Sequence, residues 1–334
     1  MATILGIEST CDETSASICI DGKIHSNTIA TQSVHEKFGG VIPELASRAH
    51  QLNIIPTVEQ AINDAKIHKN EIDAVAFSRG PGLMGSLLVG ISFAKAFALA
   101  RNLPLIEVNH MHAHILAHFI GDHKPTFPFL CLTVSGGHTQ IVQVNDYFSM
   151  ELIGQTIDDA AGEAFDKTAK ILGLAYPGGP LIDKHAQNGN SLAYTFPEPK
   201  ISNFDFSFSG LKTSILYFVQ KNTKENPNFI ENNLEDICAS VQHRIISILL
   251  NKLEKAALVT GIKNIAIAGG VSANSGLRNG INQLGEKHSW NTFIPKFEYC
   301  TDNAAMIAIA GYHKFLQNDF VGQNITPLTR WEIG

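Results

Sequence analysis

Residues 3–20 read TILGIESTCDETSASICI and residues 129–144 read FLCLTVSGGHTQIVQV, and the similarity of these two segments indicates the architecture of the chain. In each, an apolar run enters a short polar loop and a second apolar run leaves it, which is the pattern of a β-hairpin. The first loop, residues 8–14, is rich in hydroxyl and carboxylate side chains, and the second, residues 135–138, is Ser-Gly-Gly-His. Two such hairpins, each followed by further strands and helices, predict a duplicated α/β fold with a cleft between its halves.

The length of the chain also indicates two halves, because 334 residues are too many for one average domain. We expect an N-terminal lobe over residues 1–125 and a C-terminal lobe over residues 126–302. A C-terminal helix, within about residues 303–334, is expected to rejoin the N-terminal lobe.

Helical and strand patterns fill the sequence around the hairpins. A helix is predicted from Pro43, and Pro56 is expected to kink or restart it. The glycine-rich residues 79–85 follow a strand-like run and either present backbone amides to an anion or make a tight connection. The apolar helix expected over residues 86–100 is too short to span a bilayer. Further helices are predicted over residues 159–172, 234–258 and 304–316, and a strand over residues 264–268.

Charge and cysteine content limit the classes of function. The net charge of −6 argues against binding nucleic acid by bulk electrostatics, so a nucleic-acid substrate would need a local basic patch or a partner. The five cysteines are odd in number and form no Cys-x-x-Cys pair, which indicates free thiols in a reducing compartment. The N-terminal run lacks the basic start and long apolar core of a signal peptide. We therefore expect a cytoplasmic protein without a membrane partner.

Residues 109–114, Asn-His-Met-His-Ala-His, contain a candidate metal half-site. His110 and His114 stand four residues apart and share one face if the segment is helical. Two neutral imidazoles on one face suit a divalent metal. Met111 occupies the position where a His-Glu-x-x-His metalloprotease has its general base, so the pair indicates a metal but not peptide hydrolysis. The alternative is a histidine-rich helix start on a solvated surface.

Two glycine loops could bind a nucleotide. The loop 135–137, Ser-Gly-Gly, offers free backbone N–H groups to a phosphate. Gly269 and Gly270 would let a base or ribose lie close to the backbone, with Asn274 as an amide that donates and accepts. The order of the loops, two hairpins followed by Gly-Gly, is similar to that of actin-like (ASKHA) proteins, in which two ribonuclease-H-like halves enclose a nucleotide.

Seven motifs are spread over essentially the whole chain: Glu8-Ser9-Thr10-Cys11-Asp12-Glu13-Thr14, His35-Glu36-x-x-Gly39-Gly40-Val41-x-Pro43-Glu44, Asn109-His110-x-x-x-His114, Val134-Ser135-Gly136-Gly137-His138-Thr139, Phe206-Ser207-Phe208-Ser209-Gly210-Leu211-Lys212-Thr213, Gly269-Gly270-Val271-x-x-Asn274 and Thr301-Asp302-Asn303. Together they resemble the TsaD family, the tRNA adenosine threonylcarbamoyltransferases once named glycoprotein endopeptidases. The run from Asp158 to Lys167 is similar to that of the bacterial branch.

The resemblance implies a transferase that accepts threonylcarbamoyl-adenylate. Its acceptor would be N6 of the adenosine adjacent to the anticodon in tRNAs that read ANN codons, and AMP would be released. The resemblance further implies one divalent metal, Fe(II) by preference and Zn(II) as the alternative, held by His110, His114 and Asp302. It implies an adenylate site lined by Thr133, Val134, Ser135, Gly136, Gly137, Asp166, Gly179, Asp183 and Asn274.

The resemblance also implies partners and leaves a catalytic base to be found. The partners would be a TsaB-like paralogue and a small TsaE-like ATPase, the alternative being a self-sufficient homodimer. The exocyclic amine of adenine is a poor nucleophile that loses a proton during transfer, so a nearby base is useful. Asp12 and Glu13 in the first loop are the candidates. The rival functions are a non-catalytic ATPase-like scaffold and a metalloprotease.

Several of these residues have ordinary structural alternatives. Asp302 could be the N-cap of the last helix. Asp166 could be only the ion-pair partner of Lys170. His112 and His138 are expected to be positioning or surface residues rather than metal ligands.

Overall fold

The computed structural model describes residues 2–334, apart from the side chains of residues 33, 36 and 37, so the Glu36 side chain of the second motif lies outside the described residues. The chain divides into two compact units. Unit 1 comprises the chain up to Pro125 together with Pro295–Gly334, and unit 2 is Thr126–Ile294. Each unit contains one five-stranded sheet. The duplicated α/β fold expected from the two hairpins is confirmed.

The sheet of unit 1 has the strand order β3-β2-β1-β4-β5. The first hairpin forms β1 and β2, which pair antiparallel with Ile7 opposite Ala16. β4 and β5 then add in parallel beyond β1. All residues of β1 are buried, as expected of a central strand with helices on both faces. The bounds are β1 Thr3–Glu8, β2 Thr14–Ile20, β3 Lys23–Ala30, β4 Ala74–Gly80 and β5 Leu105–Asn109.

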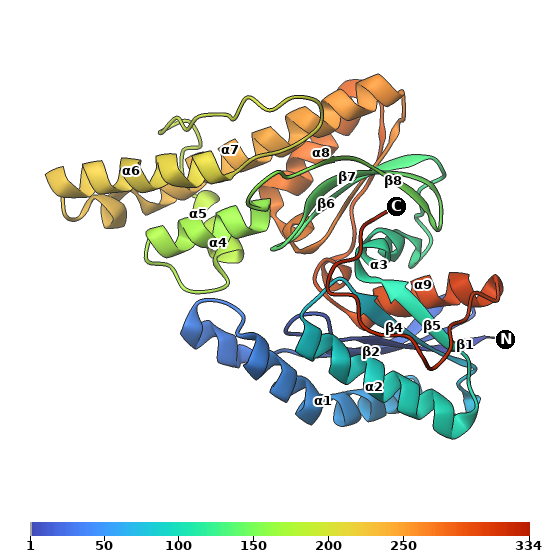
Figure 1. The fold of residues 1–334 in the computed structure, drawn as a ribbon. Coiled ribbons are helices and arrows are strands. Elements are labelled where there is room, and N and C mark those ends of the chain that lie inside the picture. Colours follow the sequence, from blue (N-terminus) through green and yellow to red (C-terminus); the bar gives the residue numbers. More distant parts are fainter. Residues whose placement is uncertain (1) are drawn as a thin grey trace. The chain divides into compact units, whose positions relative to one another are not determined.

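Helices cover both faces of this sheet. Figure 1 shows α1 and α2 side by side on one face and α9 on the other. Gly6 of β1 faces α9 so closely that a Cβ at this position would lie 2.7 Å from the Ala308 nitrogen, so the tight packing of α9 requires glycine. The helices of unit 1 are η1 Ser33–Phe38, α1 Pro43–Asp64, η2 Lys69–Glu71, α2 Met84–Arg101, α3 His110–Leu116, η3 Ala117–Phe119, η5 Phe297–Tyr299 and α9 Ala304–Leu316.

Two expectations about these helices need correction. α1 continues through Pro56, so the expected restart there is wrong, and the kink stays a prediction. Pro56 has no N–H to donate to the Leu52 carbonyl, and Leu52 is 78% exposed, so the missing hydrogen bond falls at a residue on the solvent side of the helix. α2 has 18 residues and is long and apolar enough, by length and composition alone, to cross a membrane. Its Leu87 and Ile91 are buried in the hydrophobic core of unit 1.

Unit 2 repeats the topology of unit 1. Its sheet has the order β10-β9-β6-β7-β8. The second hairpin forms β6 and β7, which pair antiparallel, and β9 lies parallel to β6 just as β4 lies parallel to β1. The register places Leu132 opposite Ile141. The bounds are β6 Phe129–Val134, β7 Thr139–Asp146, β8 Ser149–Gln155, β9 Asn264–Ala268 and β10 Asn291–Phe293.

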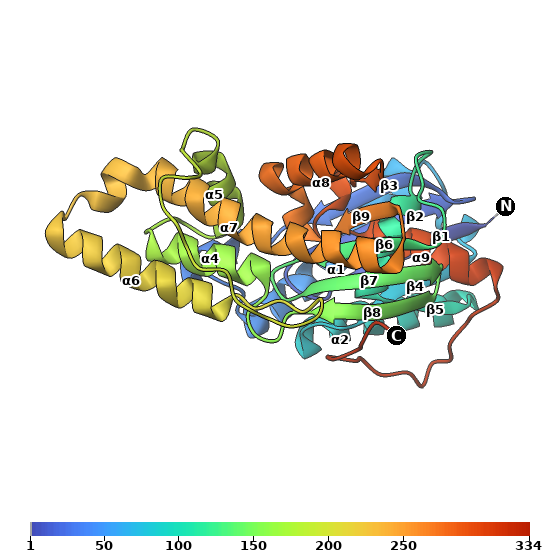
Figure 2. The same cartoon turned by 90° about the horizontal axis from the view of Figure 1, so that it is seen from above.

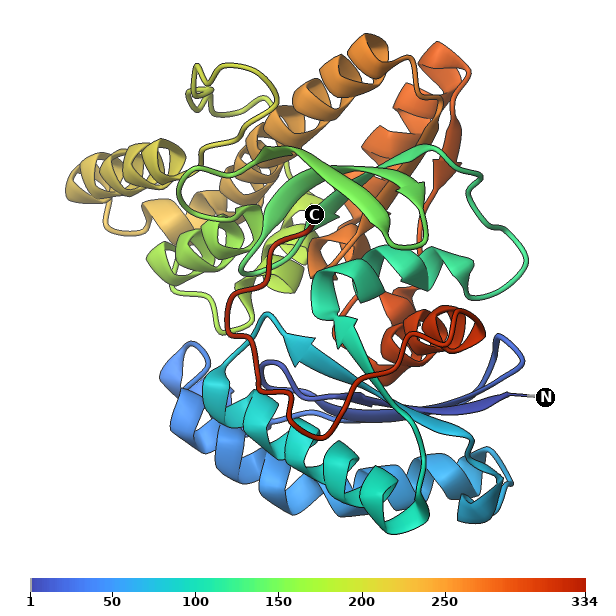
Figure 3. The same cartoon turned by 45° about the vertical axis from the view of Figure 1, so that its right-hand side comes forward.

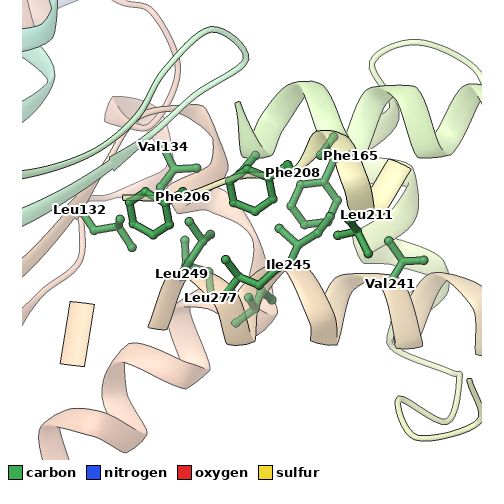
Figure 4. Close-up of a cluster of buried hydrophobic side chains, with 14 of the residues drawn as sticks. Leu132, Val134, Phe165, Phe206, Phe208, Leu211, Val241, Ile245, Leu249 and Leu277 are labelled. Atoms are coloured by element: carbon green, nitrogen blue, oxygen red, sulfur yellow. The ribbon is translucent and has the colours of Figure 1, made fainter. Parts of the chain in front are cut away.

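The core of unit 2 joins its sheet to four helices. Leu132 of β6, Phe165 of α4, Leu211 of α6, Ile245 of α7 and Leu277 of α8 belong to one buried cluster (Figure 4). The long helix α7 runs beside α5, α6 and α8 (Figure 2). The helices are α4 Ala161–Ile171, α5 Gly178–Ala186, α6 Ser209–Glu225, α7 Phe229–Thr260, η4 Gly270–Ala273 and α8 Ser275–His288.

Two helices of unit 2 begin at other residues than expected. α4 begins at Ala161 rather than at 159. Ala160, the residue before α4, has an extended backbone with φ −76° and ψ 158°, so Asp159 stays outside the helix. α7 begins at Phe229 rather than at 234, and Asn233 inside it has a non-helical backbone. This kink shifts the helical face, so the regular apolar spacing in the sequence starts only after it.

The last residues of the chain, 317–334, form a C-terminal tail without regular structure that leaves α9 and runs along unit 1 (Figure 3). Val321 donates its backbone N–H to the Leu105 carbonyl at 2.9 Å, on the edge strand β5. Arg79 Nε donates to the Thr326 carbonyl at 2.7 Å, and Lys95 Nζ to the Ile325 carbonyl at 2.9 Å. The tail thus partly covers an edge strand that would otherwise expose its backbone groups.

Candidate functional site

The two histidines of the candidate metal half-site lie on α3, which begins where β5 ends. Asn109 caps this helix, because its Oδ1 accepts the Met111 N–H at 2.8 Å. The segment is therefore helical, as the spacing required, and one helical turn separates His110 from His114. Their ring centroids are 4.7 Å apart and their planes are nearly perpendicular, at 87°.

Asp302 completes a cluster of three groups that could hold a metal ion. Asp302 Oδ1 lies 3.1 Å from His114 Nε2 and 3.5 Å from His110 Nε2. The prospective ligand atoms all lie within 4.8 Å of one another. The N-cap of α9 is Asn303, whose Oδ1 accepts the Met306 N–H at 3.1 Å. The alternative that Asp302 serves as this cap was therefore wrong, and its carboxylate faces the histidines instead.

The cluster is largely buried. His110 is 8% exposed and His114 2% exposed, so the alternative of a histidine-rich surface was wrong. Burial favours neutral imidazole, but attraction and hydrogen bonds from Asp302 and Glu8 outweigh it and raise the pKa of His110 well above its usual value. Burial likewise favours the neutral carboxyl of Asp302, yet the two histidines hold its pKa well below the ordinary range. The surroundings therefore favour an ionised Asp302 carboxylate beside a protonated His110 imidazole.

These groups fit a divalent metal ion. Two imidazole nitrogens and one carboxylate oxygen are a common donor set for divalent transition metals. In their ligand states the imidazoles are neutral and the carboxylate is charged, so a cation between them would take the place of the proton that His110 otherwise holds. Three protein ligands also leave coordination positions open to a substrate.

The first loop, residues 8–14, is held in place by side chains of α1 and α2. His50 is fully buried; its Nε2 lies 3.0 Å from the Cys11 carbonyl and its Nδ1 lies 2.8 Å from Thr14 Oγ1. Ser86 Oγ also donates to the Cys11 carbonyl, at 3.0 Å. His50 was missed from the sequence, because nothing in its local spacing marks it as a residue that spans both ends of a loop.

The acidic groups of this loop influence one another. Burial, followed by the negative charges of Asp302 and Asp12, raises the pKa of Glu13 well above its usual range. Glu13 therefore tends to hold its proton at neutral pH. Burial, together with the same acids, also raises the pKa of Cys11, so this thiol is not an activated nucleophile.

The glycine-rich loop 79–85 is a connection rather than an open anion site. The Gly82 N–H donates to the Thr329 carbonyl at 3.3 Å, and the Leu83 N–H donates to the Thr10 carbonyl at 2.8 Å. These two amides are therefore already hydrogen-bonded to carbonyl groups, one in the C-terminal tail and one in the first loop. Of the two interpretations of this loop, the tight connection is the one that agrees with the structure.

The loop Ser135-Gly136-Gly137 in unit 2 has the opposite character. The Ser135 N–H bonds the His138 carbonyl at 2.8 Å and closes the turn. A Cβ at Gly136 or Gly137 would meet no atom within 4 Å, and neither residue has a positive φ. Neither local backbone conformation nor contact within the described protein requires glycine here. The open space suits close approach of a ligand to the backbone.

Gly269 and Gly270 differ from one another. Gly269 has a φ of +85°, and a Cβ there would lie 2.5 Å from the Val134 carbonyl oxygen, so glycine is structural. Gly270 has open space around it, like Gly137. Val134 itself is fully buried, and Figure 4 shows its side chain within the core, so only its backbone could face a ligand.

Two acids predicted for the adenylate site are held by hydrogen bonds. Asp166 Oδ1 accepts the N–H groups of Gly178 at 2.8 Å and Gly179 at 3.2 Å, which replaces the expected pairing with Lys170. Burial raises the pKa of Asp166, although these two bonds oppose the shift. Asp166 therefore fixes the start of α5, where Gly179 lies.

Asp183, Asn274 and Gln242 form a connected network. Asp183 Oδ1 accepts from Gln242 Nε2 at 3.0 Å, and Gln242 Oε1 accepts from Asn274 Nδ2 at 2.7 Å. Asn274 also caps α8, since its Oδ1 accepts the Leu277 N–H at 3.0 Å. Gln242 was missed because it lies within the regular apolar spacing of α7. Thr133, the remaining residue predicted for this site, is fully buried on β6.

The two other histidines differ in their surroundings. Burial, with the positive Lys314 nearby, lowers the pKa of His112 to about 4. The His138 backbone N–H donates to Ser135 Oγ at 3.1 Å. Among the described residues, neither belongs to a cluster of three or more candidate metal ligands, so they remain outside the metal site.

Comparison with known proteins assigns the chain to a family. The profile described as "TsaD: tRNA N6-adenosine threonylcarbamoyltransferase" matches residues 23–309. The chain belongs to the TsaD family. A relative from Christiangramia forsetii, named tRNA N6-adenosine threonylcarbamoyltransferase, is 62% identical over 99% of this chain and 98% of its own length. A relative of the same name from Porphyromonas gingivalis is 56% identical over 98% of this chain and 97% of its own length.

The family match confirms the expected enzyme class, because the TsaD family is one of transferases that modify tRNA. It contradicts the scaffold and metalloprotease alternatives.

Solved structures of distant proteins share the fold. Full-length HypF in its phosphate- and nucleotide-bound form is 13% identical with a TM-score of 0.62, over 94% of this chain and 46% of HypF. The chain thus spans about half the length of HypF. An activator of 2-hydroxyisocaproyl-CoA dehydratase from Clostridium difficile is 15% identical with a TM-score of 0.50, over 96% of this chain and 98% of the activator. With the duplicated sheets, these similarities confirm the actin-like fold class of this TsaD chain.

Proposed function

We propose that this chain transfers the threonylcarbamoyl group of threonylcarbamoyl-adenylate to N6 of the adenosine adjacent to the anticodon of ANN-decoding tRNAs and releases AMP. The observation that carries the proposal is the 62% identity, over nearly the full length, to a relative named for this tRNA modification. The buried cluster of two histidines and one aspartate supports it, since the reacting carbonyl and phosphate are groups that a metal polarises or neutralises.

His110 Nε2, His114 Nε2 and one oxygen of Asp302 are the proposed metal ligands. A divalent metal bound there would supply a Lewis acid for the carbonyl or phosphate oxygen of the substrate. Fe(II) is the proposed metal and Zn(II) the alternative, because both use two histidines and one carboxylate. The protein's own contribution is to keep these three side chains converged in a largely buried place.

The proposed adenylate site lies on unit 2. The open backbone of Gly136 and Gly137 suits the phosphate, as does the loop that begins with Thr133, Val134 and Ser135. Asp166 and Asp183 would bind polar groups of the nucleoside. The two bonds to Asp166 both use Oδ1, and Asp183 Oδ2 accepts the Ser275 N–H at 3.0 Å, so each carboxylate has acceptor positions left on Oδ2. Gly179, which donates its N–H to Asp166, and Asn274, which donates to Gln242, are the remaining residues of the proposed adenylate site.

A base is needed to take the proton that leaves the adenine amine, and Asp12 and Glu13 are the proposed candidates. An acceptor must be deprotonated when it acts, and the raised pKa of Glu13 is a disadvantage for this role. Separate Asp12→Asn and Glu13→Gln variants distinguish them. The variant that lacks the catalytic base should lose transfer activity but keep its affinity for the adenylate.

We propose a TsaB-like paralogue as a partner, docking on α1, and a TsaE-like ATPase as a second partner. Leu52 and Ile55 of α1 are 78% and 56% exposed, and two large apolar side chains on one exposed stretch of helix suit a protein contact. A homodimer through the same helix is the competing proposal. We propose the cytoplasm as the location, since all five cysteines are free.

Mass spectrometry of tRNA nucleosides tests the function. The chain is incubated with threonine, bicarbonate, ATP, an adenylate-forming enzyme and an ANN-decoding tRNA, with and without the two partners. We expect N6-threonylcarbamoyladenosine, with little multiple turnover until the partners are present. Absence of the modified nucleoside from the complete mixture would contradict the function, and repeated turnover by the chain alone would contradict only the need for partners.

A further inference from the structure

Glu8 is a buried carboxylate for which the proposed reaction has given no role. It lies at the end of β1, and its side chain is fully buried. Among the side chains that the structure describes, no lysine or arginine forms an ion pair with it. Because a buried charge is costly unless it is hydrogen-bonded or paired, the partners that Glu8 does have indicate its purpose.

Both oxygens of Glu8 are used. Oε1 accepts the Thr10 N–H at 2.6 Å, which ties the carboxylate to the first loop. Oε2 lies 3.1 Å from His110 Nδ1. Thr10 Oγ1 lies 3.3 Å from the same Nδ1. The Glu8 carboxylate requires a proton on Nδ1, because a carboxylate oxygen can only accept, whereas the Thr10 hydroxyl can donate or accept and is compatible with this tautomer.

A proton on Nδ1 decides what the other ring nitrogen can do. In a neutral imidazole only one nitrogen carries a proton, so Nε2 then has a free lone pair. Nε2 is the atom of His110 that lies 3.5 Å from Asp302 Oδ1. The hydrogen bond to Glu8 therefore presents the correct nitrogen to the place where the metal would bind.

We propose that Glu8 is the positioning residue of the metal centre, holding His110 with Nδ1 protonated and Nε2 directed at the metal. Carboxylates that accept from the second ring nitrogen commonly orient metal-binding histidines and make them better ligands. Through its bond to Thr10, Glu8 also couples the metal centre to the loop that carries Asp12 and Glu13. This inference rests on the proposed metal site.

The second histidine provides an internal contrast. His114 Nδ1 is buried and has no hydrogen-bond partner within the described part of the chain. The ring of His114 is packed edge-on against His110 instead. Glu8 thus acts on one of the two imidazoles, and its loss should weaken the site rather than remove it, unlike loss of a ligand.

Zinc titration against a chromophoric chelator tests the role of Glu8, with zinc alone as the probe. Glu8→Gln keeps the size of the side chain and removes its charge, and we expect zinc affinity to fall by about 10- to 100-fold. The matched control is Asp73→Asn, since Asp73 accepts the Thr3 N–H at 2.8 Å at the opposite end of β1. Five residues of strand place it about 17 Å away, so the control should bind zinc like the wild type.

A spectrum of the unmutated protein gives a second, independent test. Long-range ¹H–¹⁵N correlation of the zinc-loaded protein, assigned by difference with His110→Asn, should show His110 with zinc on Nε2 and a proton on Nδ1. Zinc on Nδ1 would overturn the proposal. So would equal zinc affinities of folded Glu8→Gln and wild type. No zinc binding by the wild type would overturn the metal site itself and this inference with it.

Discussion

Replacing Gly137 by valine should weaken adenylate binding without weakening the fold. A Cβ at Gly137 meets no atom within 4 Å, and the residue has no positive φ. The branched side chain would therefore stand in the space proposed for the phosphate while leaving the protein's own packing intact. Valine also has fewer backbone conformations than glycine in the unfolded chain, which should raise the free energy of unfolding of the variant by up to about 1 kcal/mol.

The magnitude follows from the hydrogen bonds that the phosphate would lose. One or two backbone amides that can no longer approach cost about 1–3 kcal/mol, which corresponds to a Kd roughly 5- to 150-fold higher. Gly269→Ala should behave in the opposite way. Its φ of +85° and a Cβ only 2.5 Å from the Val134 carbonyl oxygen predict a loss of stability of about 2 kcal/mol or more.

Two measurements separate these outcomes. Calorimetric titration with a non-hydrolysable threonylcarbamoyl-adenylate analogue gives the Kd, and urea unfolding gives the stability. Gly137→Ala, with a smaller side chain, should fall between the wild type and the valine variant. An unchanged Kd in a folded Gly137→Val variant would refute the reasoning, because it would place the phosphate elsewhere.

Three further predictions concern unit 1. Replacing His110 and His114 together by alanine should abolish bound metal in elemental analysis and also lower the free energy of unfolding by roughly 2 kcal/mol, since both rings are buried; full metal occupancy would contradict the ligand assignment. Burial, with Lys124 nearby, lowers the pKa of His313 to about 4. An unfolded histidine has a pKa of about 6.5, so the stability that neutral His313 contributes is complete above that pH and is lost as the pH falls towards 4. The free energy of unfolding in urea should therefore depend less on pH, between pH 7 and pH 5, in His313→Gln than in the wild type. Arg79→Ala removes a hydrogen bond to the C-terminal tail and should cost about 2 kcal/mol, with faster hydrogen exchange in the tail; unchanged exchange would show that the tail is held by its other contacts.

Local patterns in the sequence were sufficient for much of the fold. The alternation and turn residues of the two hairpins predicted β1–β2 and β6–β7, because strand pairing across a short loop depends on residues close together in the chain. The four-residue spacing of His110 and His114 needed only a helix to bring the rings together. The same local patterns did not show that α1 would continue past Pro56, or that Asn233 would have a non-helical backbone inside α7.

The partners of the candidate site were decided by the tertiary structure. Spacing alone could not show that Asp302 would face His114 across 188 residues of sequence, or that Glu8 would bond His110 across 102. The TsaD resemblance implied the first pairing, and the role of Glu8 was not foreseen. Hydrogen bonds within a helix or hairpin follow from the chain's own geometry, whereas bonds between distant segments depend on how β1, β5, α3 and α9 pack together. Local sequence patterns thus account for the elements and the ligand pair on α3, whereas packing places Glu8 and Asp302 against that pair.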